Sequence, residues 1–240
     1  MINKEFEAAA LGLVPGSGIM GCEGDDLGTP KRPSIWLFGI EQGDPKKPTT
    51  VDVDAQGYSI SQQMQYPFNR NAFRMLSVIC GSKSDEFEKF ATERQPFVTG
   101  KQGFFKGNLF PLPCNKVSSW PKEAIRFTGF ETKNEMREWS RKARFAKFRY
   151  LMAKHQPRLL ICAGIGALAD FCLAFGIDPE TLNEVHFEGM NGLRRRYYHG
   201  KKESTTFVVI PHLSPSGPHC LSNPIDIEYL GWKIEALLNP

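Results

Sequence analysis

Four short apolar runs are the sequence feature that most constrains the fold of this chain. They cover residues 33–39, 103–113, 158–163 and 206–211, the second continuing into a proline-stiffened loop. Runs this short, bounded by glycine or proline, are typical of strands buried on both faces of a sheet. The stretches between them are long enough for helical crossovers, which join parallel strands. The pattern predicts an α/β fold, a three-layer α/β/α sandwich with a central, mostly parallel four-stranded sheet.

The stretches between the runs carry apolar residues at helical intervals. A helix is expected within residues 62–80, where Pro67 marks a break, and further helices over residues 134–155, 168–175 and 225–238. The glycine at position 164 turns the third strand directly into one of these helices.

The remaining segments are shorter and more polar. Residues 1–30 are rich in glycine and proline, which indicates a short helix followed by an irregular N-terminal arm. Residues 184–186 and 194–199 are candidate strands of a hairpin. No repeat, low-complexity segment or linker divides the chain, so we expect one domain over residues 1–240.

The composition argues against several classes of protein. The longest apolar run, residues 159–169, is too short and too rich in glycine to span a bilayer, and the charged residues near the first methionine do not suit a signal peptide. We therefore expect a monomeric, cytoplasmic protein with no membrane partner. The six cysteines form no CxxC pair, which leaves no spacing for a metal or iron–sulfur site, and no cofactor is expected.

Polar side chains follow three of the predicted strands. Glu41 comes after the first strand, Asn108 after or within the second, and His212 after the fourth. Ligands of parallel sheets bind beyond the carboxyl ends of the strands, where these side chains would meet. An acid, an amide and a histidine can perform hydrolysis, with the acid orienting water, the histidine stabilising the leaving group and the amide reading the substrate. Each of the three residues taken alone also fits a structural role in a loop.

Three motifs around these residues resemble those of the uracil-DNA glycosylase superfamily. Residues 39–43 read Gly-Ile-Glu-Gln-Gly, where the family has Gly-x-(Asp/Asn)-Pro-(Tyr/Gly). Residues 212–215 read His-Leu-Ser-Pro, where the family has His-Pro-Ser-Pro or a close variant. Asn108, in Gly-Asn-Leu-Phe-Pro, matches the context of the family's pyrimidine-reading asparagine, and residues 158–171 resemble its third core unit.

The resemblance implies a reaction as well as a fold. Members of the family flip a base out of DNA and hydrolyse its N-glycosidic bond, so the implied partner is DNA and the implied substrate is uracil or a modified or damaged base. Glu41 would position the attacking water, and His212 would stabilise negative charge on the departing base. No lysine falls within the motifs, which implies base removal without strand cleavage.

The resemblance also implies which residues hold the base and the DNA strand. Asn108 would hydrogen-bond to the edge of the base. Phe68 or Tyr66 would stack on its face, although both also fit the protein core. The first motif adds Gly39, Ile40 and Gly43 to the base-binding residues. The expected contacts to DNA phosphates are Ser214, Pro215, Ser216, Gly217, Arg194 and Arg195.

Departures from the family motifs leave other functions open. Gln42 and Leu213 stand where the family has proline, and Glu41 is one methylene longer than aspartate. A non-catalytic DNA-binding protein of the same fold is therefore one alternative. A nucleotide-cofactor enzyme is another, because Gly164-x-Gly166-x-x-Ala169 matches a dinucleotide-binding fingerprint between a strand and a helix.

Overall fold

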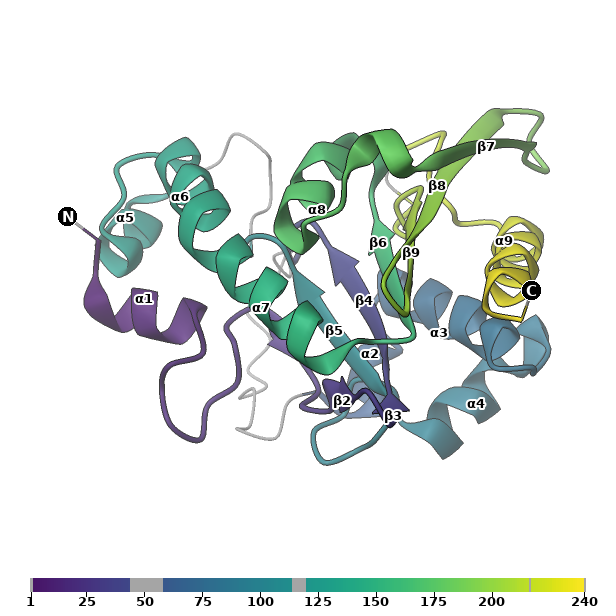
Figure 1. The fold of residues 1–240 in the computed structure, drawn as a ribbon, viewed down its shortest axis with the longest axis horizontal. Coiled ribbons are helices and arrows are strands. Elements are labelled where there is room, and N and C mark those ends of the chain that lie inside the picture. Colours follow the sequence, from purple (N-terminus) through teal and green to yellow (C-terminus); the bar gives the residue numbers. More distant parts are fainter. Residues whose placement is uncertain (1, 44–57, 114–119, 216, 240) are drawn as a thin grey trace.

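A sheet with a parallel centre forms the middle of the molecule (Figure 1). The structure is a computed structural model that describes residues 2–43, 58–113, 120–215 and 217–239. The four central strands lie in the order β5 (Phe104–Asn108), β4 (Ile35–Gly39), β6 (Leu159–Ala163) and β9 (Thr205–Ile210), each parallel to its neighbour. They coincide with the four apolar runs, so the predicted α/β class and the parallel arrangement of these strands are confirmed.

The prediction of a four-stranded sheet is wrong, because the described residues place seven strands in it. On one edge β1 (Cys22–Glu23) pairs antiparallel with β5. On the other edge β8 (Arg194–Lys202) pairs antiparallel with β9, and β7 (Asn183–Glu188) with β8. The expected hairpin therefore extends the sheet, which is mixed. These flanking strands are partly exposed and rich in polar residues, so no apolar run marks them.

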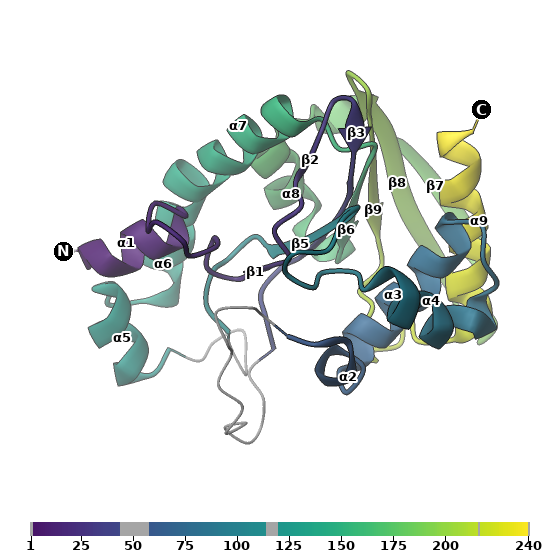
Figure 2. The ribbon, with the colours of Figure 1, turned by 90° about the horizontal axis from the view of Figure 1, so that it is seen from below.

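Helices cover both faces of the sheet (Figure 2). On one face lie α3 (Pro67–Ile79), α4 (Phe87–Arg94) and α9 (Pro224–Leu238), and on the other α7 (Phe145–His155) and α8 (Leu168–Phe175). Strand β4 is apolar at successive positions because both of its faces are buried. Ile35 and Leu37 enter the core on the α3 side, whereas Trp36 and Phe38 enter the core on the α7 side.

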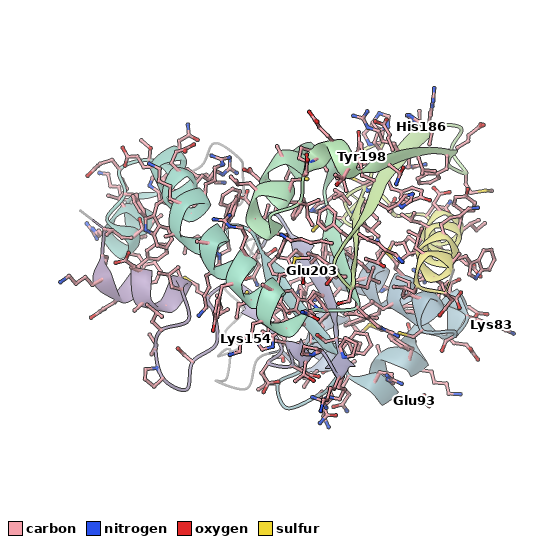
Figure 3. The ribbon with its side chains drawn as sticks, viewed as in Figure 1. Lys83, Glu93, Lys154, His186, Tyr198 and Glu203 are labelled. Atoms are coloured by element: carbon pink, nitrogen blue, oxygen red, sulfur yellow. The ribbon has the colours of Figure 1, made fainter. Side chains whose placement is uncertain are left out.

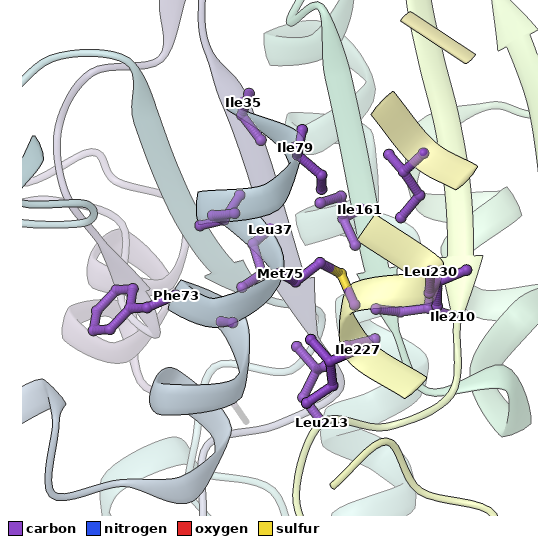
Figure 4. Close-up of a cluster of buried hydrophobic side chains, with 14 of the residues drawn as sticks. Ile35, Leu37, Phe73, Met75, Ile79, Ile161, Ile210, Leu213, Ile227 and Leu230 are labelled. Atoms are coloured by element: carbon purple, nitrogen blue, oxygen red, sulfur yellow. The ribbon is translucent and has the colours of Figure 1, made fainter. Parts of the chain in front are cut away.

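The core on the α3 and α9 side holds the His-Leu-Ser-Pro segment, residues 212–215, in place through Leu213 (Figure 4). Strand residues such as Ile161 and Ile210 pack there against Met75 of α3 and Leu230 of α9. Leu213 is fully buried in the same cluster. The loop after β9 is thus anchored by an apolar side chain directly beside His212.

The remaining helices lie mainly at one end of the molecule, where α1 (Lys4–Ala10) and α5 (Lys122–Thr128) stand beside α6 (Lys133–Trp139) (Figure 1). The expected helix over residues 134–155 comprises α6, a π-helical turn over Ser140–Arg144, and α7. Short elements complete the described chain: β2 (Gly28–Thr29), β3 (Arg32–Pro33), α2 (Ile60–Gln63), and 3₁₀ turns at Ser84–Glu86, Ile165–Ala167 and Pro179–Thr181.

Two sequence expectations need adjustment. The arm over residues 1–30 is less irregular than expected, since it supplies β1 to the sheet and β2 to a small hairpin. Helices α4 and α5 were not expected, because α4 has a charged sequence with only weak amphipathic periodicity and α5 is only seven residues long. None of the helices in the described part of the chain has the length and apolar character needed to cross a bilayer.

Candidate functional site

A cavity of about 240 Å³ opens at the carboxyl ends of β4 and β5. We call it the strand-end cavity. It brings together Glu41, Asn108 and His212 with the two aromatic candidates, as expected for loops that leave the same edge of a parallel sheet. Its full lining is Glu23, Gly39, Glu41, Gln42, Gly43, Tyr58, Tyr66, Pro67, Phe68, Asn69, Lys106, Asn108, His212 and Ser214.

Asn108 is held tightly at the end of β5. It lies directly opposite Gly39, the last residue of β4. Its side-chain Nδ2 donates to the carbonyl oxygen of Gly21 at 3.1 Å. A Cβ added at Gly39 would lie 2.5 Å from Asn108 Oδ1. Glycine at position 39 is therefore what leaves room for the amide at the edge of the cavity.

A buried arginine secures the backbone around Asn108. Arg144 is fully buried in the π-helical turn and donates to the carbonyl oxygens of Met20 (2.7 Å), Asn108 (3.0 Å), Leu109 (3.0 Å) and Ala10. No carboxylate among the described residues pairs with it. The guanidinium instead ties β5 to the segment that supplies Gly21, so it fixes Asn108 and the carbonyl that holds its amide.

His212 is a neutral hydrogen-bond donor at this site. Its Nδ1 accepts the backbone N–H of Ser214 at 3.2 Å, which leaves the ring proton on Nε2. Burial lowers the pKa of the imidazole below its ordinary value. The ring is therefore uncharged near neutral pH, and Nε2–H is the group that it can offer to a ligand. The Phe68 ring lies 5.5 Å away, centroid to centroid.

Glu41 is bound by two cations from α6. Lys133 Nζ lies 3.0 Å from both carboxylate oxygens, and Arg137 Nη2 lies 3.2 Å from Oε2. All three side chains are largely buried. The carboxylate thus faces the cavity in a fixed orientation. Sequence reasoning missed both cations, since nothing local relates them to a residue more than ninety positions away.

Aromatic side chains form one wall of the strand-end cavity. Pro67 opens α3 with Tyr66 as its N-cap, which brings Phe68 into the first helical turn beside the cavity. Tyr58, which sequence reasoning missed, contacts Tyr66 edge to face with ring centroids 6.2 Å apart. Burial raises the pKa of the Tyr58 hydroxyl. A flat, apolar ligand can stack against this wall.

A charged pair lies on another side of the cavity. Lys106 Nζ is 2.7 Å from Glu23 Oε1 and 2.9 Å from Asn69 Oδ1. Neither Lys106 nor Glu23 was expected at the site. Lys106 lies inside a short buried strand and Glu23 inside the presumed irregular arm, and only the pairing of β1 with β5 brings the two together.

A second hollow adjoins the first, with His212 in the wall of both. This hairpin groove encloses about 680 Å³ between the β7–β8 hairpin and the loops after β6 and β9. Figure 3 shows His186 on the hairpin. The groove is lined by Ile40, Gly164, Ile165, Gly166, His186, Arg194, Arg195, Arg196, Pro211, His212, His219 and Cys220.

The expected phosphate contacts divide into two groups. Arg194 is exposed and donates to His186 Nδ1 at 3.1 Å, while Ser214 lines the strand-end cavity and Pro215 and Gly217 are exposed. Arg195 is buried instead: it forms an ion pair with Asp226 at 3.2 Å and donates to the carbonyl oxygens of Pro218 and Cys220. Its guanidinium holds the 218–220 loop. Ser216 lies outside the described residues.

Of the two glycines of the dinucleotide fingerprint, Gly164 has a packing role, whereas a Cβ added at Gly166 would meet open space. Gly164 has a φ of +130°, and a Cβ there would lie 2.8 Å from a side-chain carbon of Ile40. Helix α8 leads into β7, an antiparallel strand at the edge of the sheet, rather than into a further parallel strand. The β7–β8 hairpin is therefore inserted between α8 and β9, the strand that pairs parallel with β6, so this connection differs from the compact β-α-β unit of dinucleotide-binding folds.

Comparisons with known proteins add no assignment: no family model matches the sequence, and no curated protein is similar to it. Within the described residues, no three His, Cys, Asp or Glu side chains gather in a way that could hold a metal ion.

Proposed function

We propose that the chain is a DNA glycosylase that hydrolyses the N-glycosidic bond of a flipped-out pyrimidine. One observation carries this proposal: a single cavity of about 240 Å³ presents an aromatic wall, the Asn108 amide and the neutral His212 donor. An aromatic wall suits the face of a base, an amide suits the donor and acceptor groups on its edge, and a neutral imidazole suits a carbonyl oxygen that becomes negative.

In this proposal the target nucleotide leaves the base stack before any bond breaks. Unstacking costs a few kcal/mol, which contacts inside the cavity offset. Phe68 stacks on the base, and Asn108 hydrogen-bonds to its edge. The amide needs no reorganisation on binding, since Gly39 and the Gly21 carbonyl already hold it in place.

Bond cleavage then leaves positive charge on the sugar and negative charge on the base. His212 donates Nε2–H to a carbonyl oxygen of the departing base and thereby stabilises its negative charge. Glu41 faces the cationic sugar and orients water for attack at C1′. Lys133 and Arg137 keep the carboxylate oriented. Lys106 is engaged by Glu23 and Asn69, which favours base removal without lysine attack on the sugar.

The DNA strand follows the hairpin groove in this proposal. Ser214, which lines the strand-end cavity, and the exposed Pro215 and Gly217 contact phosphates, and Arg194 adds positive charge from the hairpin. Arg195 is not retained among the phosphate contacts, because it is committed to Asp226.

A second candidate is a protein that binds a flipped base without cleaving it. One observation favours it: both carboxylate oxygens of Glu41 already accept from cations, so a water must share them. Such a protein would keep the aromatic wall and Asn108 while losing hydrolysis.

The two candidates are separated by measuring base release and DNA binding together. Labelled single-stranded and duplex oligonucleotides, each with one uracil or one 5-substituted pyrimidine, are incubated with the protein, and alkali then reveals abasic sites. We expect release that Glu41→Ala and His212→Ala abolish. Glu138→Ala, on the exposed side of α6, serves as the matched control and should retain release.

Each other outcome has a distinct meaning. Binding without release favours the non-catalytic candidate. Strand cleavage before alkali treatment contradicts base removal without lysine chemistry. Failure to bind any of these oligonucleotides overturns the proposal of a DNA-directed function.

A further inference from the structure

Lys106 and Asn108 lie on the same face of β5, two residues apart. Side chains at this spacing project in the same direction, separated by about 6.6 Å along the strand. Both line the strand-end cavity. A base that reaches Asn108 with one part of its edge can therefore reach Lys106 and its partner Glu23 with a neighbouring part.

Glu23, in the lining of the strand-end cavity, has one carboxylate oxygen that accepts no hydrogen bond from the described residues. Its Oε1 accepts from Lys106 at 2.7 Å. Its Oε2 is buried and has no hydrogen-bond partner among the described residues. A structural role in joining β1 to β5 accounts for Oε1, since Glu23 and Lys106 are paired in the sheet register. It does not account for Oε2, because buried carboxylate oxygens are normally satisfied.

The geometry points to a specificity element, an inference that rests on the proposed glycosylase function. We propose that Glu23 and Lys106 select a pyrimidine whose ring substituent carries a hydrogen-bond donor, such as a hydroxyl or amino group. A hydroxyl satisfies both side chains, since it donates to Glu23 Oε2 and accepts from Lys106 Nζ. At C5, the ring carbon that carries such a substituent, uracil has only a hydrogen atom. Thymine has an apolar methyl group there, which cannot donate to a buried carboxylate.

Three substrates that differ only at C5 test this inference. Single-stranded oligonucleotides carry uracil, thymine or 5-hydroxymethyluracil, and both base release and equilibrium binding of the matching free nucleosides are measured. We expect the hydroxymethyl base to be favoured over both others by about tenfold or more, because a site built to bond a hydroxyl discriminates against analogues that lack it.

Glu23→Gln is the informative variant. Lys106 requires an acceptor, so the amide oxygen will face Lys106 and the NH₂ group will replace Oε2. The preference for the hydroxymethyl base over uracil should fall by about tenfold or more. Glu138→Gln, exposed on α6, is the matched control and should retain the preference. Unfolding temperatures of all variants establish that they are folded.

The two readouts separate this inference from the proposed function. Selective nucleoside binding that Glu23→Gln abolishes, without base release from any oligonucleotide, supports the specificity element and refutes the glycosylase. Base release with equal preference for all three bases, or a preference unchanged in Glu23→Gln, refutes the specificity element and leaves the glycosylase standing. If no nucleoside binds and no base is released, both are refuted.

Discussion

Replacing Arg144 by methionine should destabilise the protein by about 4 kcal/mol. The guanidinium is fully buried and donates to four carbonyl oxygens. A buried acceptor left without a donor costs about 1–3 kcal/mol. The loss predicted for four such acceptors lies at the lower end of their summed cost, because the backbone around Asn108 can relax and methionine fills part of the space. Against a total stability of about 5–15 kcal/mol, this loss is large.

Urea denaturation followed by circular dichroism measures the effect. With a slope of about 3 kcal/mol/M, the midpoint should fall by more than about 1 M. Arg144→Lys keeps the charge but loses the planar fork, so it should give an intermediate loss. Arg141→Met is the matched control from the same π-helical turn. Arg141 forms partly exposed ion pairs with Asp170 and Glu138, whose loss should cost less than about 1 kcal/mol.

Arg144→Met should impair the site as well as the stability of the fold. Since Arg144 holds the backbone of Asn108 and of the segment that supplies Gly21, base release by Arg144→Met should fall even under conditions where the variant is folded. A loss of stability no larger than that of Arg141→Met would refute the view that the buried guanidinium organises this part of the structure.

Three further predictions concern the site itself. Base release should be constant above about pH 6.5 and fall in acid, because protonation of His212 removes its neutral form. Since burial lowers its pKa in the folded protein, the unfolded chain binds the proton first, so the unfolding temperature should also fall below about pH 6.5, less steeply in His212→Ala. Gly39→Ala should abolish base binding measured by calorimetry, because its Cβ displaces the Asn108 amide, whereas Gly18→Ala, exposed and outside both hollows, meets open space and should retain binding. Arg194→Met should leave the unfolding temperature unchanged and reduce the salt dependence of DNA binding by about one phosphate contact; an unchanged salt slope would exclude Arg194 from the DNA interface.

The elements that local pattern determines were predictable. The run over residues 33–39 predicts β4, because alternate residues of this strand face two cores and all of them must be apolar. Helix α8 has the predicted bounds, Leu168–Phe175, since a glycine turn opens it and Gly176 closes it with a left-handed conformation. Parallel strands then place Glu41, Asn108 and His212 at one edge, which requires only strand order and direction.

The partners of these residues were decided by tertiary structure alone. Glu41 meets Lys133 across 92 positions, and Glu23 meets Lys106 across 83, because of helix docking and strand register. Neither contact has a local periodicity that a sequence pattern could reveal. The same is true of burial: Arg194 and Arg195 are adjacent in the sequence, yet alternation along β8 exposes the first and buries the second against Asp226. The sequence thus determines where the chain carries reactive groups, and the packing of distant segments determines which of them are free to act.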